Sequence, residues 1–218
     1  MTFWEITCEL LSGFSYTLLI FYVTLAAAIP LGLLVAFGSM AKFKPLSYLT
    51  RGFVWVIRGT PLMLQIIIFA LGPGLWLDIP IRTRAAQILM VCIAFSINYA
   101  CYFSEIFRGG IESISKGQHE AGQVLGLSKW QVFRHIVLLQ VVKRVIPPMS
   151  NEIITLVKDT ALASAVVSIE LFTIAKQIVN VQVILWPLFY AGLFYLIFNG
   201  VLTIIFGLIE KRLSYFRS

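Results

Sequence analysis

Polar side chains recur within one otherwise apolar stretch, residues 145–167, where charge is costly. The charged members are Glu152, Lys158 and Asp159, and the neutral members include Asn151, Thr155, Thr160 and Ser164. A charge at the centre of a membrane helix costs about 2.5–3.5 kcal/mol on insertion scales, so we expect these side chains to face a protected interior. Glu152, Thr155 and Asp159 are spaced i, i+3 and i+7, which places them on one helix face. Such a face can bind a solute that carries an ammonium group, while the hydroxyls donate to its carboxylate.

A buried structural network is the alternative interpretation of the same stretch. Lys158 neighbours Asp159 in sequence but points about 100° away from it, so it would neutralise a carboxylate on another helix. Asn98, deep in the apolar run 85–107, is a further candidate for the lining of a pathway. Glu105 lies on the same helix face as Asn98, but we expect Glu105 to form an ion pair with Arg108 at the membrane edge.

The sequence Arg58-Gly59-Thr60-Pro61 interrupts a second apolar run, residues 52–71. Pro61 removes a backbone hydrogen bond and biases Thr60 away from helix. Broken helices at membrane depth are tolerated where they face protein or a water-filled path. Two interpretations stay open: Arg58, Thr60 and Pro61 form a gate, or Arg58 simply extends to the interface from an ordinary helix start.

A polar stretch between two apolar runs carries helix caps at both ends. Ser115 and Gln118 have capping-box spacing, so a helix can begin there. Gly126 follows about two to three turns later, where a left-handed residue after the helix end is expected. Ser128, with Gln131 three residues later, begins a second helix. A short capped helix between membrane spans does not contact lipid, so we expect a cytosolic partner to bind it.

The composition is that of a membrane protein. The chain has 218 residues, of which 59% are hydrophobic and only 12% are charged, and its mean hydropathy is +0.90. Soluble domains are about half apolar and about a quarter charged. We therefore predict one membrane domain with five spans, near residues 14–40, 52–71, 85–107, 145–167 and 183–207. Small residues in the first span predict close helix packing.

Two further segments are predicted to lie along the membrane surface. Residues from Ser128 onward form an amphipathic helix that we expect to break at Pro147-Pro148, before the fourth span. Residues 168–181 fit a second amphipathic helix, on the outer face.

The net charge of +7 raises the possibility of nucleic-acid binding. Basic residues at the ends of apolar runs are typical of cytoplasmic loops instead. The charges predict a multi-pass protein with its N-terminus outside and its C-terminus, beside Lys211 and Arg212, inside. Three cysteines, two within one apolar run, predict neither a disulfide framework nor a metal site.

Several motifs together resemble one family of transport proteins. Glu120-Ala121-Gly122, three further residues and then Gly126 resemble the Glu-Ala-Ala loop of type I ABC importer permeases. Arg58-Gly59-Thr60-Pro61, the run from Glu105 to Gly110, and Lys158-Asp159-Thr160 resemble segments of the polar amino acid uptake branch. Gly122 stands where the family usually has alanine, a difference that we expect to loosen the docking helix.

This resemblance implies an all-α membrane protein with five transmembrane helices and a cytosolic coupling helix at about residues 116–126. It implies a subunit that moves polar amino acids across a bacterial cytoplasmic membrane by alternating access. Its partners would be an ABC ATPase, an extracytoplasmic substrate-binding protein and a second permease, identical or related. ATP and magnesium would bind the ATPase, since the chain has no phosphate-binding loop motif. The coupling residues implied are Gly117, Glu120, Ala121, Gly122 and Gly126.

Two other classes of function were weighed. A stand-alone channel or secondary transporter would work without ATP and would have no use for a capped cytosolic helix. An intramembrane enzyme would have to use Glu105, Glu152, Asp159 and the two histidines. These histidines form no His-Glu-x-x-His arrangement, and no nucleophile has an activating context, so no catalytic residue is predicted.

Overall fold

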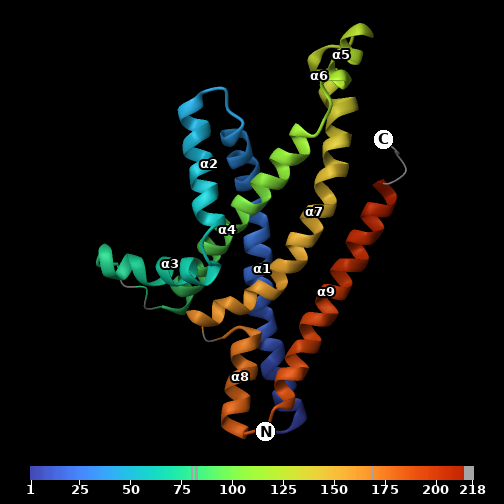
Figure 1. Cartoon of the computed structure of the whole chain (residues 1–218). Helices are drawn as coiled ribbons and strands as arrows, with labels where there is room; N and C mark the ends of the chain where they lie inside the picture. Colours follow the sequence, from blue (N-terminus) through green and yellow to red (C-terminus); the bar gives the residue numbers. More distant parts are fainter. Residues whose placement is uncertain (80, 82, 168, 214–218) are drawn as a thin grey trace.

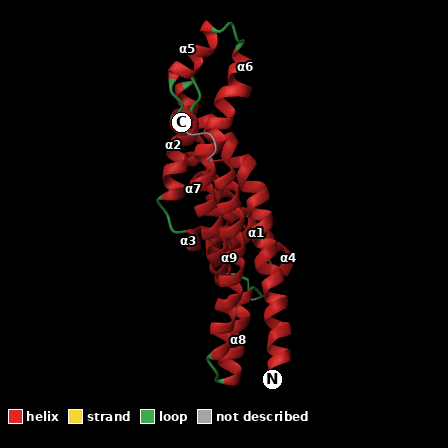
Figure 2. Cartoon of the chain, turned by 90° about the vertical axis from the view of Figure 1, so that its right-hand side faces the viewer, coloured by secondary structure: helices red, strands yellow, loops and turns green. Residues whose placement is uncertain are grey.

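The computed structural model describes residues 1–79, 81, 83–167 and 169–213, and within these ranges the chain forms helices and no strands. Figures 1 and 2 show a long bundle from which one helical hairpin, formed by α5 and α6, projects at one end. The elements are α1 (Phe3–Ser39), α2 (Lys44–Arg58), α3 (Leu62–Trp76), α4 (Arg84–Glu112), α5 (Lys116–Val124), α6 (Lys129–Val132), the π-helical η1 (Phe133–Val137), α7 (Leu138–Asp159), the 3₁₀-helical η2 (Thr160–Ala165), α8 (Leu171–Gln182) and α9 (Trp186–Leu213).

Three of the described helices are long and apolar enough to cross a membrane, namely α1, α4 and α9. The pair α2 and α3 passes the same test together and is bent by 102°, so it adds a fourth candidate. The remaining predicted span, residues 145–167, corresponds to α7 from Val145 onward and to η2. Every window of α7 long enough to span includes Lys143, Arg144 and Glu152, so α7 is too polar to be recognised by composition alone.

The core is built on α1 and α4, which pack against each other more extensively than any other pair of helices. A Cβ atom on Gly32 would lie 2.9 Å from the main-chain oxygen of Ala100 and from Cβ of Phe103. The close approach that we predicted from small residues is therefore present. Phe21, Phe95 and Phe103 are fully buried around this contact.

The first helix begins much earlier than the predicted start at residue 14. Thr2 and Glu5 form a complete capping box before α1, a local signal that the apolar pattern did not include. The extension packs against α8, because a Cβ on Gly13 would lie 3.0 Å from Cα of Leu171. The helix predicted within residues 168–181 is present as α8, Leu171–Gln182, and its place on the outer face of the membrane stays a prediction.

The N-terminal end of α8 contains a fully buried carboxylate. Glu170 caps the helix: one oxygen accepts from Phe172 N at 2.7 Å, and the other accepts from Thr173 N at 2.6 Å. Burial raises the pKa of Glu170, and these hydrogen bonds partly offset that effect. The buried charge is therefore matched to the free N–H groups of the first helical turn.

The break predicted at Pro147-Pro148 was wrong, because α7 continues through both prolines. A proline removes one main-chain donor, but a helix can continue where its packing is strong on both sides. Val145 packs against Gly110 of α4 so closely that a Cβ on Gly110 would lie 2.4 Å from Val145. On the other side Leu156 and Val157 are fully buried. The irregularity in this segment lies earlier, in η1, which is a π-helical turn.

Candidate functional site

A polar cavity of about 490 Å³ lies where the break between α2 and α3 meets α4 and α7. Three elements contribute its walls, each with polar side chains. The lining residues are Arg58, Gly59, Thr60, Pro61 and Leu62 from the break, Asn98, Tyr99 and Tyr102 from α4, and Glu152, Thr155 and Asp159 from α7. The cavity therefore unites two motifs that are almost a hundred residues apart in the sequence.

The break itself forms as the sequence predicts. Helix α2 ends at Arg58, and Pro61 occupies the N-cap position of α3 with no side-chain cap. The Thr60 hydroxyl donates to the carbonyl oxygen of Val56 at 3.0 Å. This bond satisfies one of the carbonyl groups left free at the end of α2.

Gln65 stabilises the break and was not singled out by the sequence analysis. Its Nε2 donates to the Ile57 carbonyl oxygen and to the Thr60 hydroxyl, both at 2.8 Å. Its Oε1 accepts from Nδ2 of Asn98 at 3.0 Å. Gln65 is 6% exposed, and one buried amide thereby links α2, α3 and α4. The only sequence signal was a lone glutamine in an apolar run.

The α7 wall has the geometry that the i, i+3, i+7 spacing predicts. Glu152, Thr155 and Asp159 all line the cavity, and both carboxylates are partly buried. The hydroxyl of Tyr99 donates to Oδ2 of Asp159 at 2.7 Å, which fixes the position of that carboxylate. Tyr99 is itself 2% exposed and is a second residue to which the sequence analysis gave no role.

Three predicted residues lie elsewhere. Thr160 is fully buried and donates to the Val157 carbonyl oxygen at 2.6 Å, so its hydroxyl is used locally. Ser164 belongs to η2, and neither hydroxyl is among the cavity-lining residues. Lys158 is exposed, which contradicts the buried network that we weighed for it.

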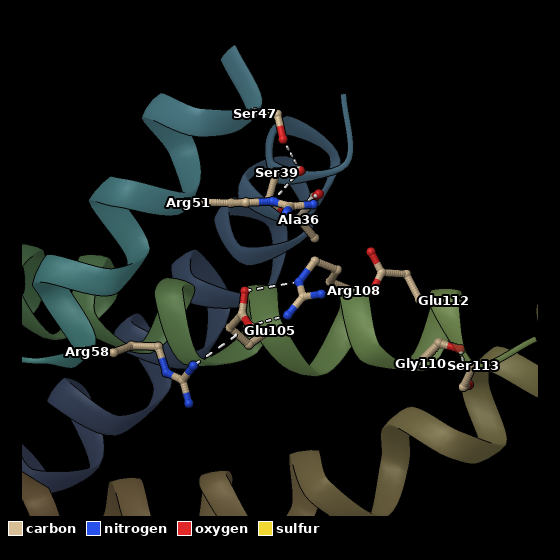
Figure 3. A network of polar contacts seen from close by, with 10 residues as sticks. All are labelled: Ala36, Ser39, Ser47, Arg51, Arg58, Glu105, Arg108, Gly110, Glu112 and Ser113. Atoms are coloured by element: carbon tan, nitrogen blue, oxygen red, sulfur yellow. Dashed lines mark hydrogen bonds and ion pairs between the residues drawn. The ribbon is translucent and has the colours of Figure 1, made fainter. Parts of the chain in front are cut away.

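An ion network adjoins the cavity between α2 and α4, shown in Figure 3. Nη2 and Nε of Arg108 donate to the two Glu105 oxygens at 2.6 and 3.2 Å, and Arg108 also binds Glu112 at 2.8 Å. The predicted pair of Glu105 and Arg108 is therefore confirmed. Arg58 approaches the same Glu105 from α2, with Nη1 3.8 Å from Oε2. A second hollow of about 230 Å³ is lined by Arg51, Arg58, Glu105 and Arg108, together with Val54 and Trp55.

Helix α5, which we predicted to be a docking helix, has a cap at each end. The Ser115 side chain accepts from Gly117 N, one residue earlier than the capping-box pattern requires. Gly126 has a φ of +73°, its N–H donates to Gln123 O, and Leu127 N donates to Gly122 O. This pair of bonds is the Schellman motif, so the helix end is fixed by local geometry.

Gly122 holds α5 against α6. It is the one buried residue of α5, and a Cβ atom there would lie only 2.4 Å from Cγ2 of Val132. The missing side chain therefore permits closer packing of α5 on α6, and the expected loosening of the helix by glycine stays a prediction. Glu120 and Ala121, by contrast, are exposed, and Val124 and Leu125 are 87% and 75% exposed. This is an unusual density of apolar surface for a free helix tip.

The family profile and the individual relatives that match this chain indicate the same family. The sequence profile of the binding-protein-dependent transport system inner membrane component matches residues 28–215. The L-cystine transport system permease protein of Bacillus subtilis is 36% identical, over 98% of this chain and 88% of the relative. The glutamine transport system permease protein of Escherichia coli is 34% identical, over 97% and 95%.

Solved structures agree with the sequence comparisons. An amino acid ABC transporter crystallised with histidines has a chain that superposes with a TM-score of 0.83 at 26% identity, covering 95% of both chains. A chain of the inward-facing methionine ABC transporter MetNI superposes with a TM-score of 0.71 at 15% identity, covering 98% of this chain and 100% of the other. The second likeness concerns the fold alone.

Proposed function

This chain belongs to the family of binding-protein-dependent transport system inner membrane components, and we propose that polar amino acids cross the membrane through the cavity between α3, α4 and α7. The chain is a multi-pass inner membrane protein and the permease subunit of an amino acid ABC importer. ATP hydrolysis takes place on separate subunits in such systems, so the chain is not itself an enzyme.

One observation carries the assignment of the pathway: two carboxylates, one guanidinium, one amide and four hydroxyl groups line a single cavity beside a broken helix. Cystine and glutamine, which the relatives' names give as cargo, both contain an α-ammonium and an α-carboxylate group. A cavity with both signs of charge is complementary to such a zwitterion. Asn98, Glu152, Thr155 and Asp159 are therefore the pathway residues that we retain. Thr160 and Ser164 are not retained, because neither lines the cavity.

The partners follow from the family. An ATPase subunit and an extracytoplasmic substrate-binding protein complete the importer. We propose that the ATPase binds α5, where Glu120 lies exposed beside the apolar tip. We also propose that two permease subunits, identical or related, share the pathway. Helix α5 and the C-terminal end of α9 lie at one end of the bundle and the N-terminus lies at the other (Figure 1), which supports an N-terminus outside and a C-terminus inside.

The test is uptake into proteoliposomes that contain the permease, its ATPase and its binding protein. A panel of the twenty L-amino acids and L-cystine is offered with and without ATP inside the vesicles. We expect uptake of at least one polar amino acid that depends on ATP, on the ATPase and on the binding protein. Uptake that persists without ATP and without the ATPase would instead identify a channel or secondary transporter.

A further inference from the structure

We propose that Arg58 receives the α-carboxylate of the transported amino acid, and that it leaves Glu105 to do so. The proposal rests on the pathway proposed above and adds a named receptor and a coupled change in an ion pair. It assigns Arg58 to neither of the two roles considered from the sequence, a gate or an interfacial anchor.

The charges of the cavity single out this side chain. Among the described residues that line the cavity, Glu152 and Asp159 are anionic and Arg58 is the one cation. The two carboxylates suit an ammonium group, but a zwitterion also needs a partner for its carboxylate. A guanidinium binds a carboxylate through two parallel hydrogen bonds, and no other lining side chain offers that geometry. The α3 N–H groups that follow Pro61 have no side-chain cap and lie on the same wall.

The present partner of Arg58 holds it weakly. Arg58 Nη1 lies 3.8 Å from Oε2 of Glu105, whereas Arg108 Nη2 lies 2.6 Å from that same oxygen. Hydrogen bonds to carboxylates are usually about 2.7–2.9 Å long, so the Arg58 contact is a loose ion pair. Because Arg108 already binds both oxygens of Glu105, Glu105 would remain paired after Arg58 departs.

The surroundings of Arg58 allow it to move between the two hollows. Its side chain is 41% exposed and lines both the large cavity and the smaller hollow beside Glu105. Its Cζ lies 4.9 Å above the centre of the Tyr102 ring, so the aromatic face stabilises the positive charge between the two positions. Tyr102 itself lines the large cavity.

This exchange would connect the cavity to the contact between α2 and α4. When a carboxylate takes Arg58, the ion pair that bridges these helices is lost and Glu105 remains with Arg108 on α4. A bound amino acid would therefore favour arrangements in which the end of α2 is released from α4. The consequence is a link from substrate occupancy to helix packing that involves no residue of the docking helix.

The experiment measures equilibrium binding to the purified permease–ATPase complex in nanodiscs, without the binding protein. The probes are the panel amino acid that is transported fastest and the methyl ester of that same amino acid, which keeps the ammonium but has no carboxylate charge. We expect the wild-type complex to bind the acid at least about tenfold more tightly than the ester. Losing one hydrogen bond to a charged group weakens binding by about this factor or more. Arg58→Gln should remove this preference, and Arg58→Lys should retain part of it.

Two further variants separate the proposed role from a structural one. Arg51→Gln alters a neighbouring arginine of α2 that lines only the smaller hollow, and it should leave the acid-to-ester ratio unchanged. Glu105→Gln should tighten binding of the acid by about two- to fivefold, because Arg58 is then free. When combined with Arg58→Gln, it should leave the affinity for the acid unchanged.

A tenfold preference that survives in Arg58→Gln, or a transporting wild-type complex that shows no preference or no binding, would overturn the proposal. Failure of every panel amino acid to be transported would instead refute the proposed function.

Discussion

The docking helix and the cavity are built in opposite ways. Helix α5 is stabilised by neighbours in sequence: Ser115 caps its start, Gly126 closes its end, and Gly122 packs against α6 a few residues later. The cavity depends on contacts between helices, because its groups come from α2, α3, α4 and α7 and are held together by bonds such as Gln65 with Asn98 and Tyr99 with Asp159. A self-contained element can transmit force as a rigid body, whereas a site shared by several helices changes whenever they move.

The largest effect should come from removing the negative charges of the cavity. The double variant Glu152→Gln and Asp159→Asn preserves the shapes of both side chains but leaves the substrate ammonium with neutral partners. We expect ATP-dependent uptake to fall by at least about 100-fold, since each charge-assisted bond contributes about 1.5–3 kcal/mol. The proteoliposome assay measures this loss as the ratio of wild-type to variant uptake.

Glu9→Gln is the matched control, because Glu9 is an exposed acid on α1 outside the cavity. It should transport like the wild type. Normal uptake by the double variant would exclude these carboxylates from the pathway and would leave the cavity as a structural hollow.

The next effect concerns the packing of the docking helix. Gly122→Ala places a Cβ atom 2.4 Å from Val132, so α5 must tilt away from α6, and we expect uptake to fall about tenfold through poorer contact with the ATPase. Gly192→Ala on α9 is the matched control and should transport like the wild type, since a Cβ atom on this glycine would meet nothing within 4 Å.

The double variant Gly122→Ala and Val132→Ala should regain most of the lost activity, because it removes the clash. Should Gly122→Ala alone transport normally, α5 would not need its observed position, and the contrast between a rigid docking helix and an adaptable cavity would fail.

The same contrast explains which features could be predicted from the sequence. The caps at Ser115, Gly126 and Ser128 and the break at Pro61 are determined by residues within a few positions, so local rules suffice. The face shared by Glu152, Thr155 and Asp159 was also predictable, because helical spacing alone defines it.

The roles of Gln65 and Tyr99 could not be predicted, because each depends on which helix lies opposite. The continuation of α7 through Pro147 and Pro148 is a similar case. Local propensity favours a break there, and packing against Gly110 and the buried core prevents it. At this point of contact with α4, tertiary packing prevailed over local sequence preference.

A smaller effect should follow from breaking the link that Gln65 makes across the cavity. Gln65→Leu is close in size but leaves the Ile57 carbonyl and the Asn98 amide without their partner. We expect a loss of about 1–3 kcal/mol in the free energy of unfolding, with uptake reduced about threefold through a less well-defined cavity.

Thermal unfolding of the purified permease and the uptake assay measure the two quantities. Gln87→Leu on α4 is the control, as a partly buried glutamine outside the cavity. A Gln65→Leu protein as stable as the wild type would mean that the broken helix maintains its bend without the amide.

The smallest effect separates backbone conformation from packing at the end of the docking helix. Gly126 has a left-handed φ of +73°, and a Cβ atom there would meet nothing within 4 Å, so any effect of substitution comes from the backbone alone. Alanine disfavours this conformation by about 1 kcal/mol, while asparagine tolerates it better. Gly126→Ala should therefore increase amide hydrogen exchange of α5 about fivefold, with Gly126→Asn between it and the wild type, and uptake should fall less than twofold in both. Equal exchange in all three proteins would show that the ATPase-facing helix is held by α6 rather than by its own cap, and the docking element would then depend on tertiary contacts as the cavity does.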